Sequence, residues 1–274
     1  MSEIISLNIK LTELNIYPVK SLRQISLLQS LVEPFGLQHD RRWMVVDEQG
    51  KMITQRQQSR MCLIQPSLTD KGVSLHAAGM LDLQVTKPVT RTRQLVTVWE
   101  DNCQAYDAGD EAAKWLSDFL SVNCRLVYFP SDEFRQVDLN YAQPGDRTAF
   151  SDGFPLLLIS QTSLDDLNQR LTLNRQTPIT MNRFRPNLVV SGCDAFAEDN
   201  WKIIRIGEIT FRIVKPCSRC VIPNIDIETA ERGNEPARTL ASYRRRDNRI
   251  YFGQNAIAEN PGKLTIGMPV EIIE

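Results

Sequence analysis

The sequence lacks the features that would attach a protein to a membrane or to nucleic acid. It has no apolar run of the roughly 18 residues needed to span a bilayer. Its first ten residues carry acidic and polar side chains where a secretory signal would have a basic start and an apolar run, so we expect a cytoplasmic protein. The formal net charge is only −1, which gives no electrostatic reason to expect nucleic acid or an anionic membrane as a partner.

Cysteine and histidine are also scarce. The 274 residues include six cysteines and two histidines, too few cysteines for a secreted domain held together by disulfides. Only one CxxC pattern occurs, so a four-ligand zinc site would have to be assembled from scattered residues. We expect four of the cysteines to be small buried apolar residues, namely Cys62, Cys103, Cys124 and Cys193.

The remaining pair, Cys217 and Cys220, lies in the sequence KPCSRCVIP (215–223), directly after a strand-like run at 209–214. Arg219 precedes the second cysteine, and a neighbouring guanidinium favours the thiolate, the form that binds metals and attacks electrophiles. The spacing is compatible with a redox dithiol, half of a zinc site, or one metal-ligating thiolate with a neighbour. A thioredoxin-like site is disfavoured, because Pro223 and the alternating apolar residues around it do not continue as a helix.

The hydrophobic pattern predicts a mostly β (α+β) fold with few helices. Strands are expected at 4–11 and 14–19, in a hairpin over 42–54, and at several later positions. Helices are expected at 110–120 and at 163–171, the second capped by Ser163. The continuous apolar run at 155–159 predicts a strand buried on both faces, and 130–154 reads as a long loop. We place the two domains at 1–125 and 126–274.

Several short motifs, in a fixed order, together resemble one family. In the second half they are FRPN (184–187), SGCD (191–194), AEDNW (197–201), CSRC (217–220), FGQN (252–255) and ENPG (259–262). In the first half they are YPVKS (17–21) and HDRRWMV (39–45). The chain resembles proteins in which a MOSC N-terminal β-barrel domain precedes a MOSC β-barrel domain, and it is similar to the mitochondrial amidoxime-reducing component and its bacterial counterparts.

The resemblance implies a molybdenum cofactor, a molybdenum ion held by a pterin (molybdopterin). It implies Cys220 as the metal ligand and catalytic thiolate, with Cys217 as a neighbour that does not bind the metal. Asp194 would be an acidic catalytic residue that manages protons. The residues implied to bind the cofactor are Lys20, Ser21, Arg41, Ser160, Gln161, Thr162, Arg185, Ser218, Arg219 and Asn255. A pyridoxal-phosphate-binding-like character is also among its implications.

Local chemistry agrees with anion binding at several of these positions. Lysine and arginine suit a phosphate, and the free N–H groups at a helix start near 160–163 favour an anion. Arg185 precedes Pro186, which should force it into extended backbone that projects into a cleft. Because the cofactor needs converging cations, we expect Lys20, Arg41, Arg185 and Cys220 to line one cleft. Asn255 stands where relatives carry a tyrosine, which affects substrate preference.

The resemblance implies an oxidoreductase that reduces small N-hydroxylated compounds. The sequence has no C-x4-C-x2-C pattern of a [2Fe–2S] domain, so the electrons would come from a separate flavoprotein reductase or ferredoxin. The alternatives are a carrier that binds cofactor or sulfur on Cys220 without turnover, and a degenerate structural protein.

Two surface and core features complete the expectations. The basic run at 243–246 with Arg249 is either a solvated face or a docking site for an acidic electron-transfer protein. The aromatic residues Trp99, Trp115, Phe119 and Trp201 are expected in the core or between domains.

Overall fold

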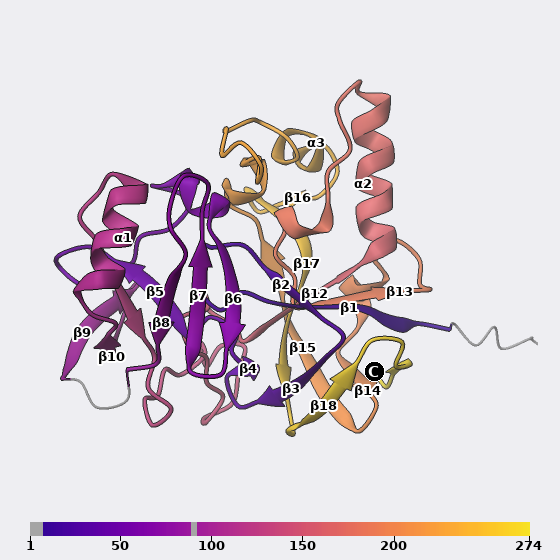
Figure 1. Cartoon of the computed structure of the whole chain (residues 1–274). Helices are drawn as coiled ribbons and strands as arrows, with labels where there is room; N and C mark the ends of the chain where they lie inside the picture. The colour runs from indigo at the N-terminus through magenta and orange to yellow at the C-terminus, as the bar shows by residue number, and fades with distance from the viewer. Residues whose placement is uncertain (1–7, 89–91) are drawn as a thin grey trace, which may run out of the picture.

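The computed structural model of the chain describes residues 8–88 and 92–274, and it shows a mostly β protein (Figure 1). The predicted mostly β class with few helices is therefore confirmed. The two strands predicted at 4–11 and 14–19 are instead one strand, β1 (Lys10–Ile16), and residues 4–7 lie outside the described residues. Within the described ranges, no helix combines the length and apolar composition that crossing a membrane requires.

A nine-stranded sheet dominates the second half of the chain and includes the first strands as well. In spatial order its members are β19 (Val270–Ile272), β14 (Ile203–Ile206), β15 (Ile209–Ser218), β17 (Arg249–Ala258), β12 (Leu156–Ser160), β13 (Leu188–Ser191), β1 and β2 (Ile25–Leu27), and β16 (Arg245–Arg246) pairs with β17. Strand β12 is central, parallel to β13 and antiparallel to β17. Its apolar run is almost fully buried, as the sequence predicts.

The first strands join the sheet of the second half (Figure 1). Strand β1 pairs antiparallel with β13 in that sheet. Strand β3 (Gln29–Glu33) lies between β18 (Gly262–Thr265) and β4 (Gly36–Leu37) in a separate three-stranded sheet, which also contains strands of both halves. Two of the sheets therefore contain strands from both sides of residue 125. One consequence is that the segment just after β1, residues 17–24, is held against the second half.

The remaining strands form two smaller sheets. The first contains β5 (Trp43–Val46), β11 (Arg125–Tyr128), β10 (Asp101–Asp107) and β9 (Arg93–Val98), in that order. The second is β6 (Gln65–Thr69), β7 (Gly72–His76) and β8 (Leu83–Thr86). They share one apolar core with helix α1 (Asp110–Leu120), which buries Leu116 and Phe119 against it. That helix lies where its apolar periodicity predicts.

Helix α2 (Gln161–Leu173) begins earlier than predicted. Its N-cap is Ser160, whose side-chain oxygen accepts the Ser163 N–H at 3.2 Å. The prediction of Ser163 as the cap is wrong, because Ser163 lies in the first turn and its hydroxyl donates to the buried Glu198 carboxylate at 2.8 Å. Within the described residues, the shorter helical elements are α3 (Ala237–Ala241) and four 3₁₀ turns, at Ser59–Leu63, Met181–Arg183, Ala197–Asn200 and Ile222–Asn224.

The stretch between β11 and β12 has no helix or strand, as predicted, but it is packed rather than free. Arg135 is buried and donates to the carbonyls of Ala149, Ser151 and Asp152 at 2.6–3.0 Å. Its guanidinium also forms an ion pair with Asp101, the first residue of β10, at 2.7 Å. One guanidinium therefore fixes the backbone of residues 149–152, and through it the position of Asp152.

The predicted core residues are buried with one exception among the aromatic side chains. Trp115, Phe119 and Trp201 are buried, as are the four cysteines expected in the interior. Trp99 is 44% exposed, which corrects its placement in the core. Its backbone lies in the left-handed region at the turn between β9 and β10, where the ring faces outward and the Arg56 guanidinium lies 4.5 Å from its centroid.

Candidate functional site

A cleft in the structure is lined by residues from both halves of the chain. Lys20, Arg41, Arg185 and Cys220 all line it, so the four residues expected to converge do so. Ser21, Ser218, Arg219 and Asn255 line the same cleft. The convergence follows from the pairing of β1 with β13, which brings residues 17–24 against the loops around Arg185 and Cys220.

Three of the cleft residues have backbone conformations that non-glycine residues rarely adopt. Ser21, Arg41 and Arg185 have φ values of +69°, +45° and +60°. The extended backbone predicted for Arg185 from its proline neighbour is thus wrong. Its N–H donates to Asn182 O in a tight turn, and its guanidinium donates to Leu22 O at 2.7 Å, contacts that hold the left-handed conformation. Such conformations cost about 1–3 kcal/mol each and concentrate at functional sites.

Tyr17 anchors two of the arginines. The Arg41 and Arg185 guanidinium carbons lie 4.2 Å and 4.1 Å from its ring centroid. Burial raises the pKa of Tyr17 even though both arginines act to lower it, so the ring stays neutral between two cations. Burial also lowers the pKa of Arg185 to about 10, still well above neutral pH. Stacking on one neutral ring therefore fixes two positive charges at the cleft wall.

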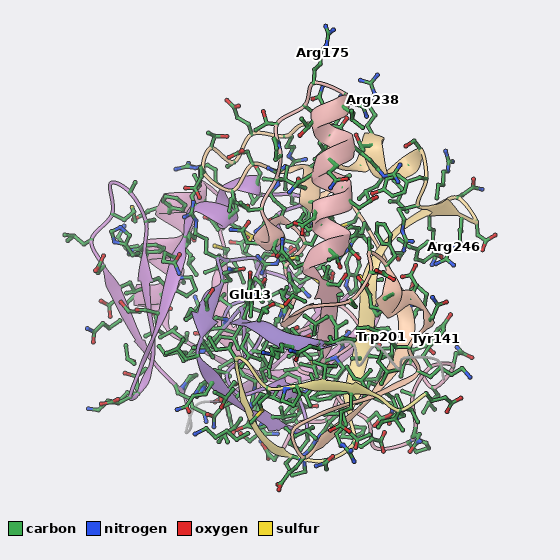
Figure 2. The ribbon with its side chains drawn as sticks, turned by 90° about the vertical axis from the view of Figure 1, so that its right-hand side faces the viewer. Glu13, Tyr141, Arg175, Trp201, Arg238 and Arg246 are labelled. Atoms are coloured by element: carbon green, nitrogen blue, oxygen red, sulfur yellow. The ribbon has the colours of Figure 1, made fainter. Side chains whose placement is uncertain are left out.

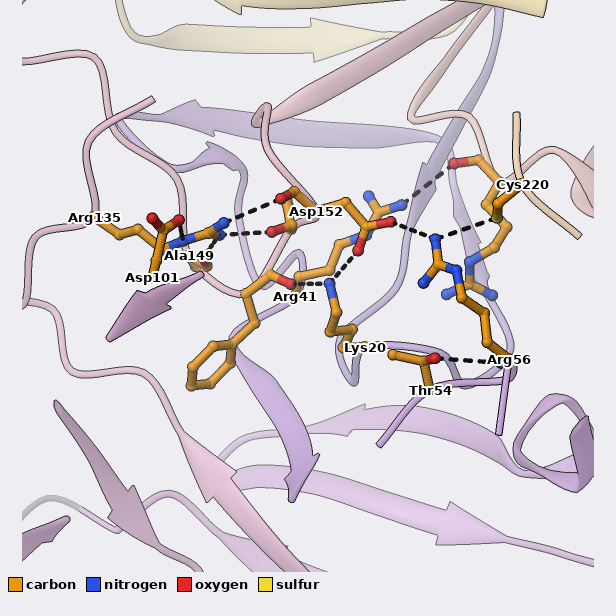
Figure 3. Close-up of polar contacts among 12 residues, drawn as sticks. Lys20, Arg41, Thr54, Arg56, Asp101, Arg135, Ala149, Asp152 and Cys220 are labelled. Carbon is orange, nitrogen blue, oxygen red and sulfur yellow. Dashed lines mark hydrogen bonds and ion pairs between the residues drawn. The ribbon is translucent and has the colours of Figure 1, made fainter. Parts of the chain in front are cut away.

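Lys20 is a buried cation with a carboxylate partner. Its amine donates to the Phe150 carbonyl at 2.7 Å and to the Asp152 carboxylate at 2.5 Å (Figure 3). Burial lowers the pKa of Lys20 to about 8, although Asp152 opposes this shift. Partial desolvation would raise the pKa of Asp152, but the charges of Lys20 and Arg56 outweigh it and hold this pKa well below its usual range. At neutral pH the pair is therefore ionised.

Arg56 joins the carboxylate to the thiol. Its Nη2 lies 3.4 Å from Asp152 Oδ2 and 3.2 Å from the Cys220 sulfur, so Figure 3 shows it between the two groups. Arg56 and Asp152 are site residues that the sequence reasoning missed. Arg56 belongs to the first half and Cys220 to the second, and only the assembled fold brings them together.

The two cysteines of the CxxC pattern differ in their surroundings. Both are free thiols, with Cys220 exposed and Cys217 half-buried. Burial raises the pKa of Cys217, which favours its neutral thiol. Cys220 accepts the Ile222 N–H at 3.5 Å and faces the cleft. Among the described residues no group of three or more His, Cys, Asp or Glu side chains could hold a metal. Of the two sulfurs that line the cleft, that of Cys220 is the more exposed.

Two buried guanidinium nitrogens at the cleft have no hydrogen-bond partner among the described residues. They are Arg56 Nη1 and Arg219 Nη2. The other Arg219 nitrogens donate to the carbonyls of Phe252 and Phe184 at 2.8 Å and 3.0 Å. Buried donors without an acceptor cost free energy, and an anion placed in the cleft would supply the acceptors. The unpaired N–H donors thus fit the phosphate of a bound group. The sulfur of Cys220 fits a metal carried by the same group.

Four predicted site residues do not line this cleft. Ser160 is fully buried as the α2 cap and donates to Glu198 at 2.8 Å. Gln161 and Thr162 lie in the first turn of α2, where they contact Asp165 and Ser160. Asp194 is exposed in the turn after β13. The carboxylate that the cleft does contain is Asp152.

Comparison with known proteins gives concordant matches along the chain. Residues 8–123 match the MOSC N-terminal beta barrel domain, and residues 145–271 match the MOSC domain. Mitochondrial amidoxime-reducing component 1 of Mus musculus is 36% identical over 281 residues, covering 95% of this chain and 81% of that protein. The protein of the same name from Homo sapiens is 35% identical, with 95% and 82% covered. A molybdenum cofactor sulfurase of Danio rerio is 34% identical over 89% of this chain, which spans only 31% of that longer protein.

Proposed function

The chain belongs to the family of MOSC-domain proteins that includes the mitochondrial amidoxime-reducing components, and we propose that it is a molybdenum-cofactor-dependent reductase of N-hydroxylated compounds. The observation that carries this proposal is the convergence of Lys20, Arg41 and Arg185 on the free thiol of Cys220 in one cleft. The reaction converts N–OH to N–H and water, consuming two electrons and two protons. When bound, the cofactor would supply the two-electron metal centre that removes the oxygen.

Each group of the cleft has a distinct task in this proposal. The Cys220 thiolate would ligate molybdenum, which favours sulfur donors. Lys20, Arg41 and Arg185 would bind the phosphate of the cofactor, with the Ser21 hydroxyl as a further donor. The unpartnered Arg219 nitrogen would find its acceptor on the same group. The three cations are fixed before binding by Asp152, Tyr17 and neighbouring carbonyls, so little rotamer freedom remains to be lost.

Asp152 is the carboxylate placed to orient a substrate in the cleft. It is half-exposed toward the cleft and lies on the opposite side of Arg56 from Cys220. An ionised carboxylate there can accept a hydrogen bond from the N–OH group and orient it. Asp152, rather than the Asp194 expected from the sequence, is thus the acidic residue that would contact substrate in this proposal, and its role would be orientation.

The electron donor in this proposal is a separate protein, either a flavoprotein reductase or a ferredoxin. The cytoplasmic location and the pyridoxal-phosphate-binding-like character both stay untested predictions.

Reduction of an amidoxime by the purified protein tests the proposal. Reduced methyl viologen supplies electrons without a partner protein, and amidine formation is followed by chromatography. We expect turnover in the wild type and in Cys217→Ala, and none in Cys220→Ala. Absence of turnover in molybdenum-loaded wild type would overturn the proposal.

The similarity to a molybdenum cofactor sulfurase supports one second candidate, a module that carries sulfur or cofactor on Cys220. A sulfur carrier would show a mass increase of one sulfur atom on the Cys220 peptide, removed by a reductant. A reductase would show an unmodified Cys220 together with turnover. Intact-protein and peptide mass spectrometry before and after reduction therefore separates the two functions.

A further inference from the structure

A short hairpin projects three arginines from the edge of the molecule. Strand β16 pairs with the start of β17 through the turn at Asp247 and Asn248, whose φ values of +47° and +60° are those of a type I′ turn. Arg245, Arg246 and Arg249 are all exposed on it. We call these three side chains the arginine hairpin. Figure 2 shows Arg246 at the outer edge of the protein.

The register of the hairpin is electrostatically unfavourable. Arg246 lies directly opposite Arg249 in the antiparallel pair, and like charges in such positions destabilise a hairpin. Among the described residues, no carboxylate forms an ion pair with any of the three arginines. Arg245 instead donates to Asn248 at 3.2 Å, and Arg246 packs against the ring of Tyr251. The hairpin thus carries three arginines against one carboxylate, the exposed Asp247 of its turn, so its net charge is positive.

The neighbouring Arg244 shows the contrast. It is mostly buried and donates to Asp199 at 2.6 Å, so it belongs to the interior network. The basic run seen in the sequence therefore divides into one structural arginine and three free ones. Contacts inside the protein explain the presence of Arg244 but not that of the other three arginines.

The arginine hairpin is connected directly to the loop that carries the thiol. Ser218 pairs with Tyr251, and the Arg219 N–H donates to the Ile250 carbonyl at 2.7 Å. Arg249, the first residue of β17, is two residues before Tyr251, about 7 Å away at the usual strand rise. Cys220 is itself exposed, and Val221 beside it is 53% exposed. A protein that covers the hairpin would therefore lie beside the opening to Cys220.

We propose that the arginine hairpin is the docking surface for an acidic electron-carrier protein of the ferredoxin type. This inference rests on the proposed reductase function, which needs two electrons per N–OH group, one from each of two reduced carriers. The overall charge of −1 argues for a local contact of complementary charge rather than for the broad basic surface of a nucleic-acid-binding protein.

Binding is measured with an acidic plant-type [2Fe–2S] ferredoxin and the purified full chain by isothermal titration calorimetry. The test variant is Arg246→Glu/Arg249→Glu, which keeps a like-charge pair and so leaves hairpin stability nearly unchanged. The matched control is Arg175→Glu/Arg238→Glu, two exposed arginines beyond the far end of α2 and on α3 (Figure 2). At low ionic strength we expect at least about tenfold weaker binding in the test variant and less than about twofold in the control. High salt should remove the difference.

Equal weakening in both variants, or no binding by the wild type at low salt, would overturn the proposal. The same would follow if the wild type, but not the test variant, bound duplex DNA or phosphatidylserine vesicles in place of the ferredoxin. Turnover assays separate this failure from failure of the proposed function. If the docking inference holds, viologen-driven turnover is equal in wild type and test variant while ferredoxin-driven turnover falls in the test variant. If both proteins turn over with viologen and their ferredoxin-driven rates are also identical, the docking surface alone is refuted. If the wild type does not turn over with viologen, the proposed reductase function is refuted.

Discussion

Replacing Asp152 with asparagine should destabilise the cofactor-free protein by leaving a buried cation without its partner. The Lys20 side chain is only 5% exposed, whereas the Asp152 side chain is 55% exposed. The substitution keeps the size of the side chain and removes its charge. Lys20 would retain the carbonyl of Phe150 at 2.7 Å as its acceptor.

The size of the effect follows from the unequal exposure of the two partners. Breaking a fully buried ion pair costs about 3–5 kcal/mol, because a charge is left unpaired away from water. Exposed pairs contribute only about 0–1 kcal/mol. With one buried and one half-exposed partner, we expect Asp152→Asn to lower the free energy of unfolding by about 1–3 kcal/mol at pH 7.

The penalty should depend on pH through Lys20. Its pKa in the folded protein is about 8, below the ordinary value of 10.5, so the folded state loses this proton first as pH rises. Wild-type stability should therefore increase between about pH 8 and pH 10, and the ion pair with Asp152 disappears over the same range. The difference between wild type and Asp152→Asn should then be smaller at high pH than at pH 7.

Urea unfolding, followed by tryptophan fluorescence at pH 7 and at about pH 10, measures these differences in the free energy of unfolding. The control is Asp118→Asn, which breaks the exposed pair with Lys114 on α1 and should cost less than about 0.5 kcal/mol. A penalty for Asp152→Asn no larger than that of the control, or one that does not shrink at high pH, would refute the account of Lys20.

Two further substitutions test the site from other directions. Ser160→Ala removes the α2 cap and a partner of the buried Glu198, so urea unfolding should show a loss of about 1–2 kcal/mol. Because Ser160 does not line the cleft, the Ser160→Ala protein should contain as much molybdenum as the wild type. A large loss of molybdenum would assign Ser160 a role in cofactor binding. Arg185→Lys keeps the charge but loses the planar stack on Tyr17, so cofactor affinity should fall by about tenfold, measured as molybdenum retained through dialysis. Retention equal to the wild type would contradict the role given to its guanidinium.

Local patterns were enough to predict much of the fold and part of the site. The apolar run before α2 and the periodicity of α1 depend on neighbours in sequence, and both elements occur where predicted. The pair Cys217 and Cys220 could be singled out because the CxxC pattern and Arg219 are contiguous, whereas the choice of Cys220 within the pair came from the family resemblance. Lys20, Arg41 and Arg185 could be named only through the family resemblance, since one lysine or arginine resembles any other in a sequence.

The residues that were missed depend on contacts far apart in sequence. Arg56 reaches Cys220 across 164 positions and Lys20 reaches Asp152 across 132. No local pattern encodes either contact. The conformation of Arg185 was mispredicted for the same reason, because Tyr17 and Leu22, both in the first half of the chain, hold its guanidinium.

Elemental analysis of the purified protein tests the central claim most directly. Wild type, Cys220→Ala and Cys217→Ala are prepared from cells supplied with molybdate and analysed by plasma mass spectrometry. The cleft with one exposed thiol predicts near-stoichiometric molybdenum in the wild type and in Cys217→Ala, and its loss in Cys220→Ala. Molybdenum that persists in Cys220→Ala, or zinc in place of molybdenum in the wild type, would contradict the account.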